Sequence, residues 1–404
     1  MSKLALCLVL ILALAALAGV AHAQGAAAAP APLLKGDFET DPGAAGWVAT
    51  PSVSPVLVAT GKGHSGEHYL EMSAGKWESP KFPVTALHFY RADFWYQAVG
   101  SGHMASFCYD ADGKVLYSDD YEFLAPSGAW AHKTFIFRAD NNAATAKLMF
   151  MPGYWPDAPT KLLRVDDLQV DEVSHADALQ AADEMWTGMA PLTWTPPAGR
   201  FKHIPKAMAK LRAGQPLKIV MLGDSIINDT SNGPWDLLLD RLYPGAQVQL
   251  QVSVRGSTGC WYYKDPVQLK AYVLDYAPDL VWIGGISQRG DIDAVQSVMD
   301  QTRAAFPGVE FVLSSPTCSA MGDPRTNGEW SSVTDPNGDN WRSKMYRLAQ
   351  AEQAEYIDLA SGWGWYMKNQ DKQYDVYVRD TIHANDRGSM VLSRVIEAYF
   401  KPEG

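Results

Sequence analysis

The chain has 404 residues, of which 47% are hydrophobic and 20% are charged, and its formal net charge is −11. This composition is typical of a globular protein that is long enough to form two domains. The negative charge argues against nucleic acid or an anionic membrane as the main partner.

The first 23 residues predict a secretory signal peptide. Lys3 precedes an uncharged apolar run over residues 4–20, and the Ala-His-Ala sequence at 21–23 matches an A-x-A cleavage site. We therefore expect a mature chain that begins at Gln24 and is secreted or periplasmic; a retained anchor is the alternative. No later stretch is apolar enough for insertion into a membrane.

The next part of the chain predicts an all-β domain. Residues 24–32 are rich in Ala and Pro and predict a linker. Over residues 33–174, short alternating segments at 88–96, 134–138 and 146–151 are separated by turn-forming residues. Alternation of period two with frequent turns predicts an antiparallel β-sandwich.

Residues 175–214 predict a connector that packs as a strap between the domains. Its segments 175–189 and 202–211 have helical patterns, and 194–200 is expected to be extended.

From residue 215 to residue 404, continuous apolar strands alternate with segments of helix length. This order predicts a three-layer α/β domain with a parallel sheet that is covered on both faces. The expected strands are 217–222, 248–254, 280–286, 309–316 and 355–359, and the expected helices are 232–243, 266–277, 291–305, 338–353 and 386–400.

Two short motifs in this domain supply the parts of a hydrolytic triad. Ser225 follows the first predicted strand in the sequence Gly223-Asp224-Ser225, and Asp380-Thr-Ile-His383 precedes the last predicted helix. Reactive residues of an open α/β sheet gather beyond the carboxyl ends of its strands. We therefore expect Ser225 to be the nucleophile, His383 its base and Asp380 the carboxylate that orients the histidine.

These motifs resemble those of the SGNH, or GDSL-type, hydrolases. The resemblance covers about residues 215–404 and implies an oxyanion hole built from backbone N–H groups. It assigns donors to Ser225 and to Gly259, with Gly256 in reserve. Each of these glycines has a plain turn as its alternative.

One block departs from the pattern of this family. The family places an asparagine where this chain has Ile286, and isoleucine has no side-chain donor. Loss of one oxyanion donor costs about 2.7–4 kcal/mol in the transition state. Gln288 is the expected substitute, with Ser287 and Asn228 as other polar candidates. Both Gln288 and Ser287 have helix capping as an alternative role.

The sandwich resembles the galactose-binding-like jelly-roll modules that accompany carbohydrate-active enzymes. The resemblance rests on four segments: 34–40, 46–47, 64–71 and 163–170. It implies sugar stacking on exposed aromatic side chains, with burial in the core as the alternative; the candidates are Trp77, Trp95, Tyr154 and Trp155. A structural Ca²⁺ held by Asp37, Glu39 and Asp167 is a further possibility that competes with ordinary acidic turns.

After signal cleavage, three cysteines remain. Cys260 and Cys318 either form a disulfide or remain unpaired buried thiols, and the sequence favours neither. Cys108 has no predicted partner.

The function expected from these features is removal of acyl groups, above all acetyl, from a polysaccharide or oligosaccharide by a secreted serine esterase. The reaction requires no metal or cofactor. A lipase or lysophospholipase, a lyase or glycosidase on the same fold, and a non-catalytic glycan-binding protein are the alternatives. The substrate polysaccharide and the oligomeric state are not predicted.

Overall fold

The computed structural model describes residues 31–402, except 51–54, 60–62, 154–160, 318–321 and 329. The predicted signal peptide, Tyr154, Trp155 and Cys318 lie outside the described residues. No helix within the described ranges is long and apolar enough to cross a membrane.

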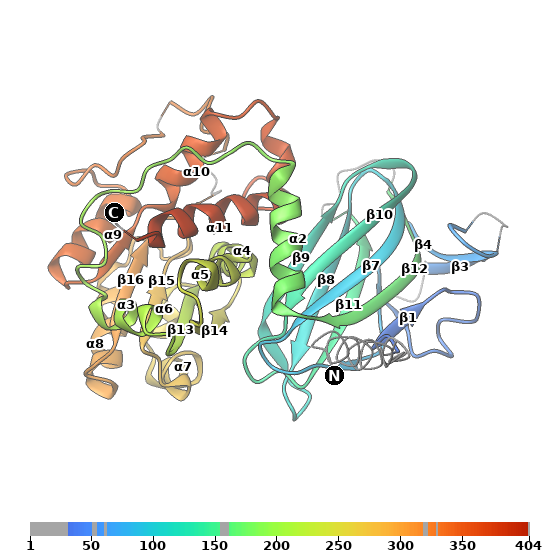
Figure 1. The fold of residues 1–404 in the computed structure, drawn as a ribbon, viewed down its shortest axis with the longest axis horizontal. Coiled ribbons are helices and arrows are strands. Elements are labelled where there is room, and N and C mark those ends of the chain that lie inside the picture. The colour runs from blue at the N-terminus through green and yellow to red at the C-terminus, as the bar shows by residue number, and fades with distance from the viewer. Residues whose placement is uncertain are drawn as a thin grey trace, which may run out of the picture. The chain divides into compact units, whose positions relative to one another are not determined.

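Two antiparallel sheets occupy the first part of the chain (Figure 1). One has the order β10-β7-β12-β4-β3, with β1 paired to β12, and the other has the order β2-β5-β11-β8-β9, with β6 paired to β11. The strands are β1 Leu34–Gly36, β2 Val48–Thr50, β3 Pro55–Ala59, β4 His68–Met72, β5 Lys76–Glu78, β6 Phe82–Pro83, β7 Phe89–Val99, β8 Gly102–Tyr109, β9 Val115–Leu124, β10 Ser127–Arg138, β11 Thr145–Pro152 and β12 Leu162–Val173.

The alternation in β7 explains how these sheets form a core. Tyr90, Phe94 and the residues in phase with them are buried, while Asp93 and Trp95 lie on the opposite, partly exposed face. Side chains of a strand alternate between the two faces of its sheet, so one face of β7 joins the apolar core and the other faces outward. Both sheets contribute to this core.

The second part of the chain forms a five-stranded parallel sheet with the order β14-β13-β15-β16-β17. Its strands are β13 Pro216–Gly223, β14 Gln247–Val254, β15 Leu280–Ile283, β16 Glu310–Ser314 and β17 Glu355–Ile357. The strand order reverses at β13, because β14 pairs on one side of it and β15 on the other. A crevice for ligands typically opens at such a point, beyond the carboxyl ends of the strands.

Helices cover both faces of this sheet (Figure 1). Ile219 and Met221 of β13 pack in one core cluster with α3, α5 and α11, while Val220 and Leu222 pack in another with α6 to α9. The helices are α3 Pro205–Arg212, α4 Ser225–Asn232, α5 Trp235–Leu242, α6 Cys260–Tyr263, α7 Pro266–Tyr272, α8 Ile292–Ala305, α9 Trp341–Ala351, α10 Leu359–Lys368 and α11 Asp386–Phe400, with short 3₁₀ turns η1 Leu274–Tyr276 and η2 Tyr374–Val376.

The connector begins with α2, His175–Thr187, which Ser174 caps through a reciprocal bond with Asp177. The part predicted to be extended, 194–200, forms no strand. Just after it, the N–H groups of Phe201 and His203 donate to the carboxylate of Glu355. Glu355 belongs to β17, so the connector binds beside an edge strand of the parallel sheet.

Candidate active site

Ser225 lies at the first position of a helix that begins where the central strand β13 ends. Gly223 is the last residue of β13, and Asp224 caps α4 by accepting a hydrogen bond from the Ile226 N–H at 3.0 Å. The turn therefore places the Ser225 hydroxyl beyond the carboxyl end of the sheet, at the amino end of a helix.

The segment before α11 brings the other two predicted residues to Ser225. His383 Nε2 lies 2.8 Å from Ser225 Oγ, and His383 Nδ1 lies 2.8 Å from Asp380 Oδ2. The side chain of Asp380 is only 3% exposed, while that of His383 is 20% exposed. The three side chains thus form a continuous chain of hydrogen bonds, in which Asp380 is buried and Ser225 and His383 are partly exposed.

Asp380 is held in a form suited to orienting the histidine. Burial by itself raises the pKa of Asp380, but hydrogen bonds from the His383 ring and from the Ile382 and His383 N–H groups outweigh it and lower the pKa below its usual value. The ionised Asp380 accepts a hydrogen bond from the protonated Nδ1 of His383. The unprotonated Nε2 can then accept the proton of Ser225.

The two N–H groups predicted to form the oxyanion hole are those of Ser225 and Gly259. Neither the Ser225 N–H nor the Gly259 N–H donates a hydrogen bond to any residue that the structure describes. Gly259 is buried and packs closely, since an added Cβ would lie 2.7 Å from Gln288 Oε1. Gly256 is exposed, and an added Cβ there would meet nothing within 4 Å. The packing therefore favours Gly259 over Gly256.

The third predicted donor, Gln288, has another use. Its Oε1 accepts a hydrogen bond from the Cys260 N–H at 2.8 Å, and its Nε2 donates to the Gly284 carbonyl at 2.8 Å. The side chain ties the loop after β14 to the loop after β15. Because both ends of the amide are engaged with backbone, Gln288 supports the position of Gly259, and its role as a third donor stays a prediction.

Asp224 is a residue of the site that the sequence patterns leave as a spacer in the serine motif. It is fully buried, and its Oδ2 accepts hydrogen bonds from the Ile286 N–H at 2.7 Å and the Ser287 N–H at 2.6 Å. Gly285 has a φ of +95°, and a Cβ there would lie 2.4 Å from Asp224 Oδ1. Asp224 thus joins the serine turn to the loop that carries Ile286. Aspartate is a preferred N-cap residue, but the sequence of α4 has no helical signal, so this role could not be predicted.

Of the aromatic side chains predicted to stack on sugars, the structure describes Trp77 and Trp95. Trp77 is 7% exposed and belongs to the sandwich core, so it is not available for stacking. Trp95 lies on the outward face of β7 and stacks on His64 with a ring separation of 3.7 Å. Trp130 of β10 lies beside both His64 and Tyr69.

The carboxylates considered for calcium are engaged separately. Glu39 accepts hydrogen bonds from the Glu67 and His68 N–H groups, and Asp167 binds His64 and Ser65. Within the described part of the chain, no group of three or more His, Cys, Asp or Glu side chains is arranged to hold a metal ion. Cys108 and Cys260 are buried and form no disulfide with another described residue, and the bridge predicted between Cys260 and Cys318 involves a residue outside the described ranges.

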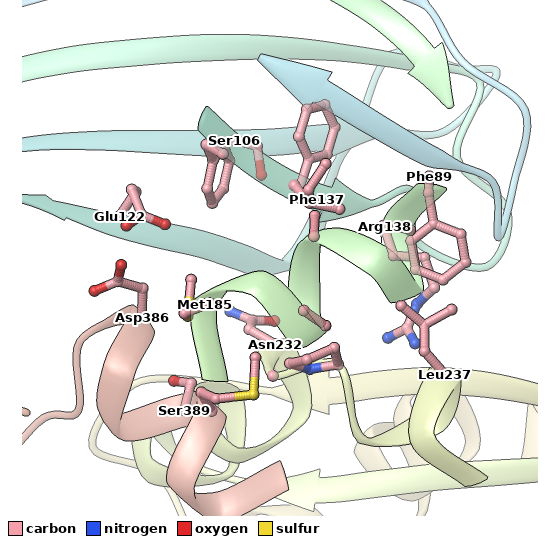
Figure 2. Close-up of a pocket in the computed structure, with 18 of the residues that line it drawn as sticks. Phe89, Ser106, Glu122, Phe137, Arg138, Met185, Asn232, Leu237, Asp386 and Ser389 are labelled. Carbon is pink, nitrogen blue, oxygen red and sulfur yellow. The ribbon is translucent and has the colours of Figure 1, made fainter. Parts of the chain in front are cut away.

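A cavity of about 290 Å³ lies away from the predicted triad, between strands of the sandwich, α2 and the start of α11 (Figure 2). The carboxylates of Glu122 and Asp386 lie close to one another in Figure 2, and Lys133 Nζ binds both. Burial and the nearby Asp386 raise the pKa of Glu122, while Lys133 helps hold the pKa of Asp386 at about 2 despite its burial. Lys133 therefore compensates the charge buried at this cavity.

The sequence matches no model of a known protein family and no curated protein. Among solved structures, a two-domain esterase active on acetylated mannans matches 51% of this chain and 56% of its own, with 15% identity and a TM-score of 0.40. A GDSL-like lipase from Parabacteroides merdae matches 46% of this chain and 96% of its own, with 15% identity and a TM-score of 0.36. A xylan-binding module from Paenibacillus barcinonensis matches 36% of this chain and 99% of its own, with 16% identity and a TM-score of 0.28. At these values, the similarities assign neither a fold nor an activity to this chain.

Proposed function

We propose that this chain is a serine esterase of the SGNH type that removes acetyl or similar small acyl groups from a polysaccharide or oligosaccharide outside the cytoplasm. In this proposal, residues 215–404 form an SGNH domain with a flavodoxin-like sheet, and residues 33–174 form a jelly-roll module. The observation that supports it most strongly is the hydrogen-bonded chain Ser225–His383–Asp380 at the carboxyl end of a parallel sheet.

The reaction follows from the positions of these groups. Ser225 Oγ attacks the ester carbonyl while His383 Nε2 takes its proton. The negative oxygen of the tetrahedral intermediate binds the Ser225 and Gly259 N–H groups. His383 then returns the proton to the departing sugar oxygen, which leaves an acyl group on Ser225. Water, activated by His383, releases the carboxylic acid and restores the serine.

The outward face of the sandwich supports a carbohydrate substrate. Trp95 and Trp130 present partly exposed rings beside a polar group in which Arg164 donates to Glu71 and Gln97. Aromatic faces flanked by hydrogen-bonding groups suit sugar rings, which have both apolar faces and hydroxyl edges. We propose that this face binds the polysaccharide on which the esterase acts.

Release of acetate from acetylated oligosaccharides tests the proposal. Wild type should release acetate and should cleave long-chain esters much more slowly, whereas Ser225→Ala should show only the background rate. Equal rates for the two proteins would refute the serine mechanism. A preference for long-chain esters would favour a lipase, and glycan binding without turnover of either ester would favour a binding protein.

A further inference from the structure

A buried ion pair joins the helix of the proposed nucleophile to the loop of the proposed base. Asp229 belongs to α4, and its Oδ1 accepts a hydrogen bond from Arg379 Nη2 at 2.8 Å. The side chains of Asp229 and Arg379 are 4% and 10% exposed. Arg379 directly precedes Asp380, so this pair ends next to the carboxylate of the proposed triad.

The second oxygen of Asp229 reaches the other end of the same loop. Asp229 Oδ2 accepts a hydrogen bond from the Ala384 N–H at 3.1 Å, and Ala384 directly follows His383. The loop is also closed on itself, because the Arg379 N–H donates to the His383 carbonyl at 3.0 Å and the Arg379 guanidinium donates to the Ala384 carbonyl. One carboxylate therefore holds both flanks of the segment that carries Asp380 and His383.

The spacing along α4 explains why one helix can hold the loop at two points. Asp229 follows Ser225 by four residues, and residues four apart lie on the same face of an α-helix, about one turn from each other. The face that presents the Ser225 hydroxyl to His383 thus also presents the Asp229 carboxylate to Arg379 and Ala384.

We propose that Asp229 is a positioning residue for the esterase reaction, fixing with Arg379 the distance between Ser225 Oγ and His383 Nε2 before substrate binds. The inference rests on the proposed function. Proton transfer from serine to histidine requires a short, aligned hydrogen bond, and a misplacement of about 1 Å costs about 100-fold in rate. Loss of the pair should therefore lower kcat and leave KM nearly unchanged.

Three variants separate positioning from folding. Asp229→Asn keeps the size of the side chain but removes the negative charge that faces the buried Arg379, and breaking a buried ion pair on one side destabilises a protein strongly. Asp229→Asn/Arg379→Gln removes both charges and should recover much of the lost thermal stability. Asp358→Asn is the matched control, because it breaks another largely buried arginine pair, with Arg342, that makes no hydrogen bond to the three proposed catalytic residues.

The measurement is kcat and KM for p-nitrophenyl acetate, together with the Tm of each variant. We expect kcat to fall about 10- to 100-fold in Asp229→Asn and to stay low in the double variant even as its Tm recovers. Asp358→Asn should lower Tm with kcat within twofold of wild type. If Asp229→Asn does not fold, the double variant carries the same test.

A double variant with kcat within twofold of wild type would overturn the positioning role, as would an equal loss of kcat in Asp358→Asn. Failure of the proposed function would look different, because wild type and Ser225→Ala would then have the same rate whatever the state of Asp229.

Discussion

At the scale of single residues, the two buried carboxylates of the site, Asp380 and Asp224, bind different kinds of group. Asp380 binds the proposed base through the His383 ring, whereas Asp224 binds only backbone N–H groups of its own turn and of the loop after β15. In the proposed mechanism the first role is chemical, whereas the second is architectural. Both rely on the strength of hydrogen bonds to an ionised acceptor in a buried setting.

Asp380→Asn tests the chemical role. An amide in place of the carboxylate no longer stabilises the histidine cation and can hold the ring in the wrong tautomer. We expect kcat for p-nitrophenyl acetate to fall about 10³- to 10⁴-fold with little change in KM. Steady-state kinetics would measure this, and a loss of less than tenfold would argue against the assigned role of Asp380.

Ile286→Asn tests the departure from the pattern of the SGNH hydrolases that the sequence motifs resemble. Gln288 is engaged with backbone, so in the proposed mechanism the hole relies on the two N–H donors of Ser225 and Gly259. An asparagine at position 286 supplies the amide that the family places there. We expect kcat/KM for small acetyl esters to rise at least tenfold. Removal of one oxyanion donor typically lowers kcat by roughly 10²- to 10³-fold, so adding one should recover part of that factor. Ile286→Leu should leave the rate unchanged, and an equal rate for both variants would contradict this view of the hole.

At the scale of elements, the loop after β15 requires glycine at position 285, next to Asp224. Gly285→Ala would combine a strained φ of +95° with a Cβ 2.4 Å from Asp224 Oδ1. Gly290→Ala is the matched control, since its φ is +69° and nothing lies within 4 Å of the added Cβ. We expect Gly285→Ala to lower the free energy of unfolding by at least about 2 kcal/mol more than Gly290→Ala. Urea denaturation measures the difference, and equal losses would mean that Asp224 does not constrain the loop.

Elements with a strong periodic pattern were predictable from the sequence. The five parallel strands lie where continuous apolar runs indicated them, and α11 spans the predicted residues 386–400. The short helices α4, α6 and α10 were not predicted. Serine, asparagine and threonine fill much of α4, and a Gly-Trp-Gly sequence interrupts α10, so their local propensities gave no helical signal.

Only some residues of the site could be predicted from the sequence. Serine, histidine and aspartate carry their chemistry in their side chains, so their motifs could be singled out, and the structure brings Ser225, His383 and Asp380 within hydrogen-bonding distance. The ties made by Gln288 and Asp229 depend on distances between loops that are far apart in sequence. No local pattern specifies which backbone groups a buried amide or carboxylate will reach.

At the scale of the whole molecule, a buried histidine of the sandwich makes stability depend on pH. His103 of β8 is 1% exposed, and burial, together with the charge of Arg379, lowers its pKa from 6.5 to about 4. The unfolded chain therefore takes up a proton on this residue at a higher pH than the folded chain does. Its contribution to stability is present above pH 6.5 and is lost as pH falls toward 4.

His103→Gln should remove this dependence. We expect the free energy of unfolding of wild type to lose up to about 3 kcal/mol between pH 6.5 and pH 4 through this group, and the variant to lose correspondingly less. Parallel curves for wild type and His103→Gln would contradict the assignment.

The central claim is that Ser225 is a nucleophile activated by His383, and covalent labelling with a fluorophosphonate tests it most directly. Attack by Ser225 Oγ on phosphorus expels fluoride and leaves a phosphonyl group on the serine. Intact-mass and peptide measurements should find one adduct per chain, located on Ser225, with none in Ser225→Ala and labelling at least 100-fold slower in His383→Ala. An adduct on another residue, or equal labelling of wild type and Ser225→Ala, would contradict the account.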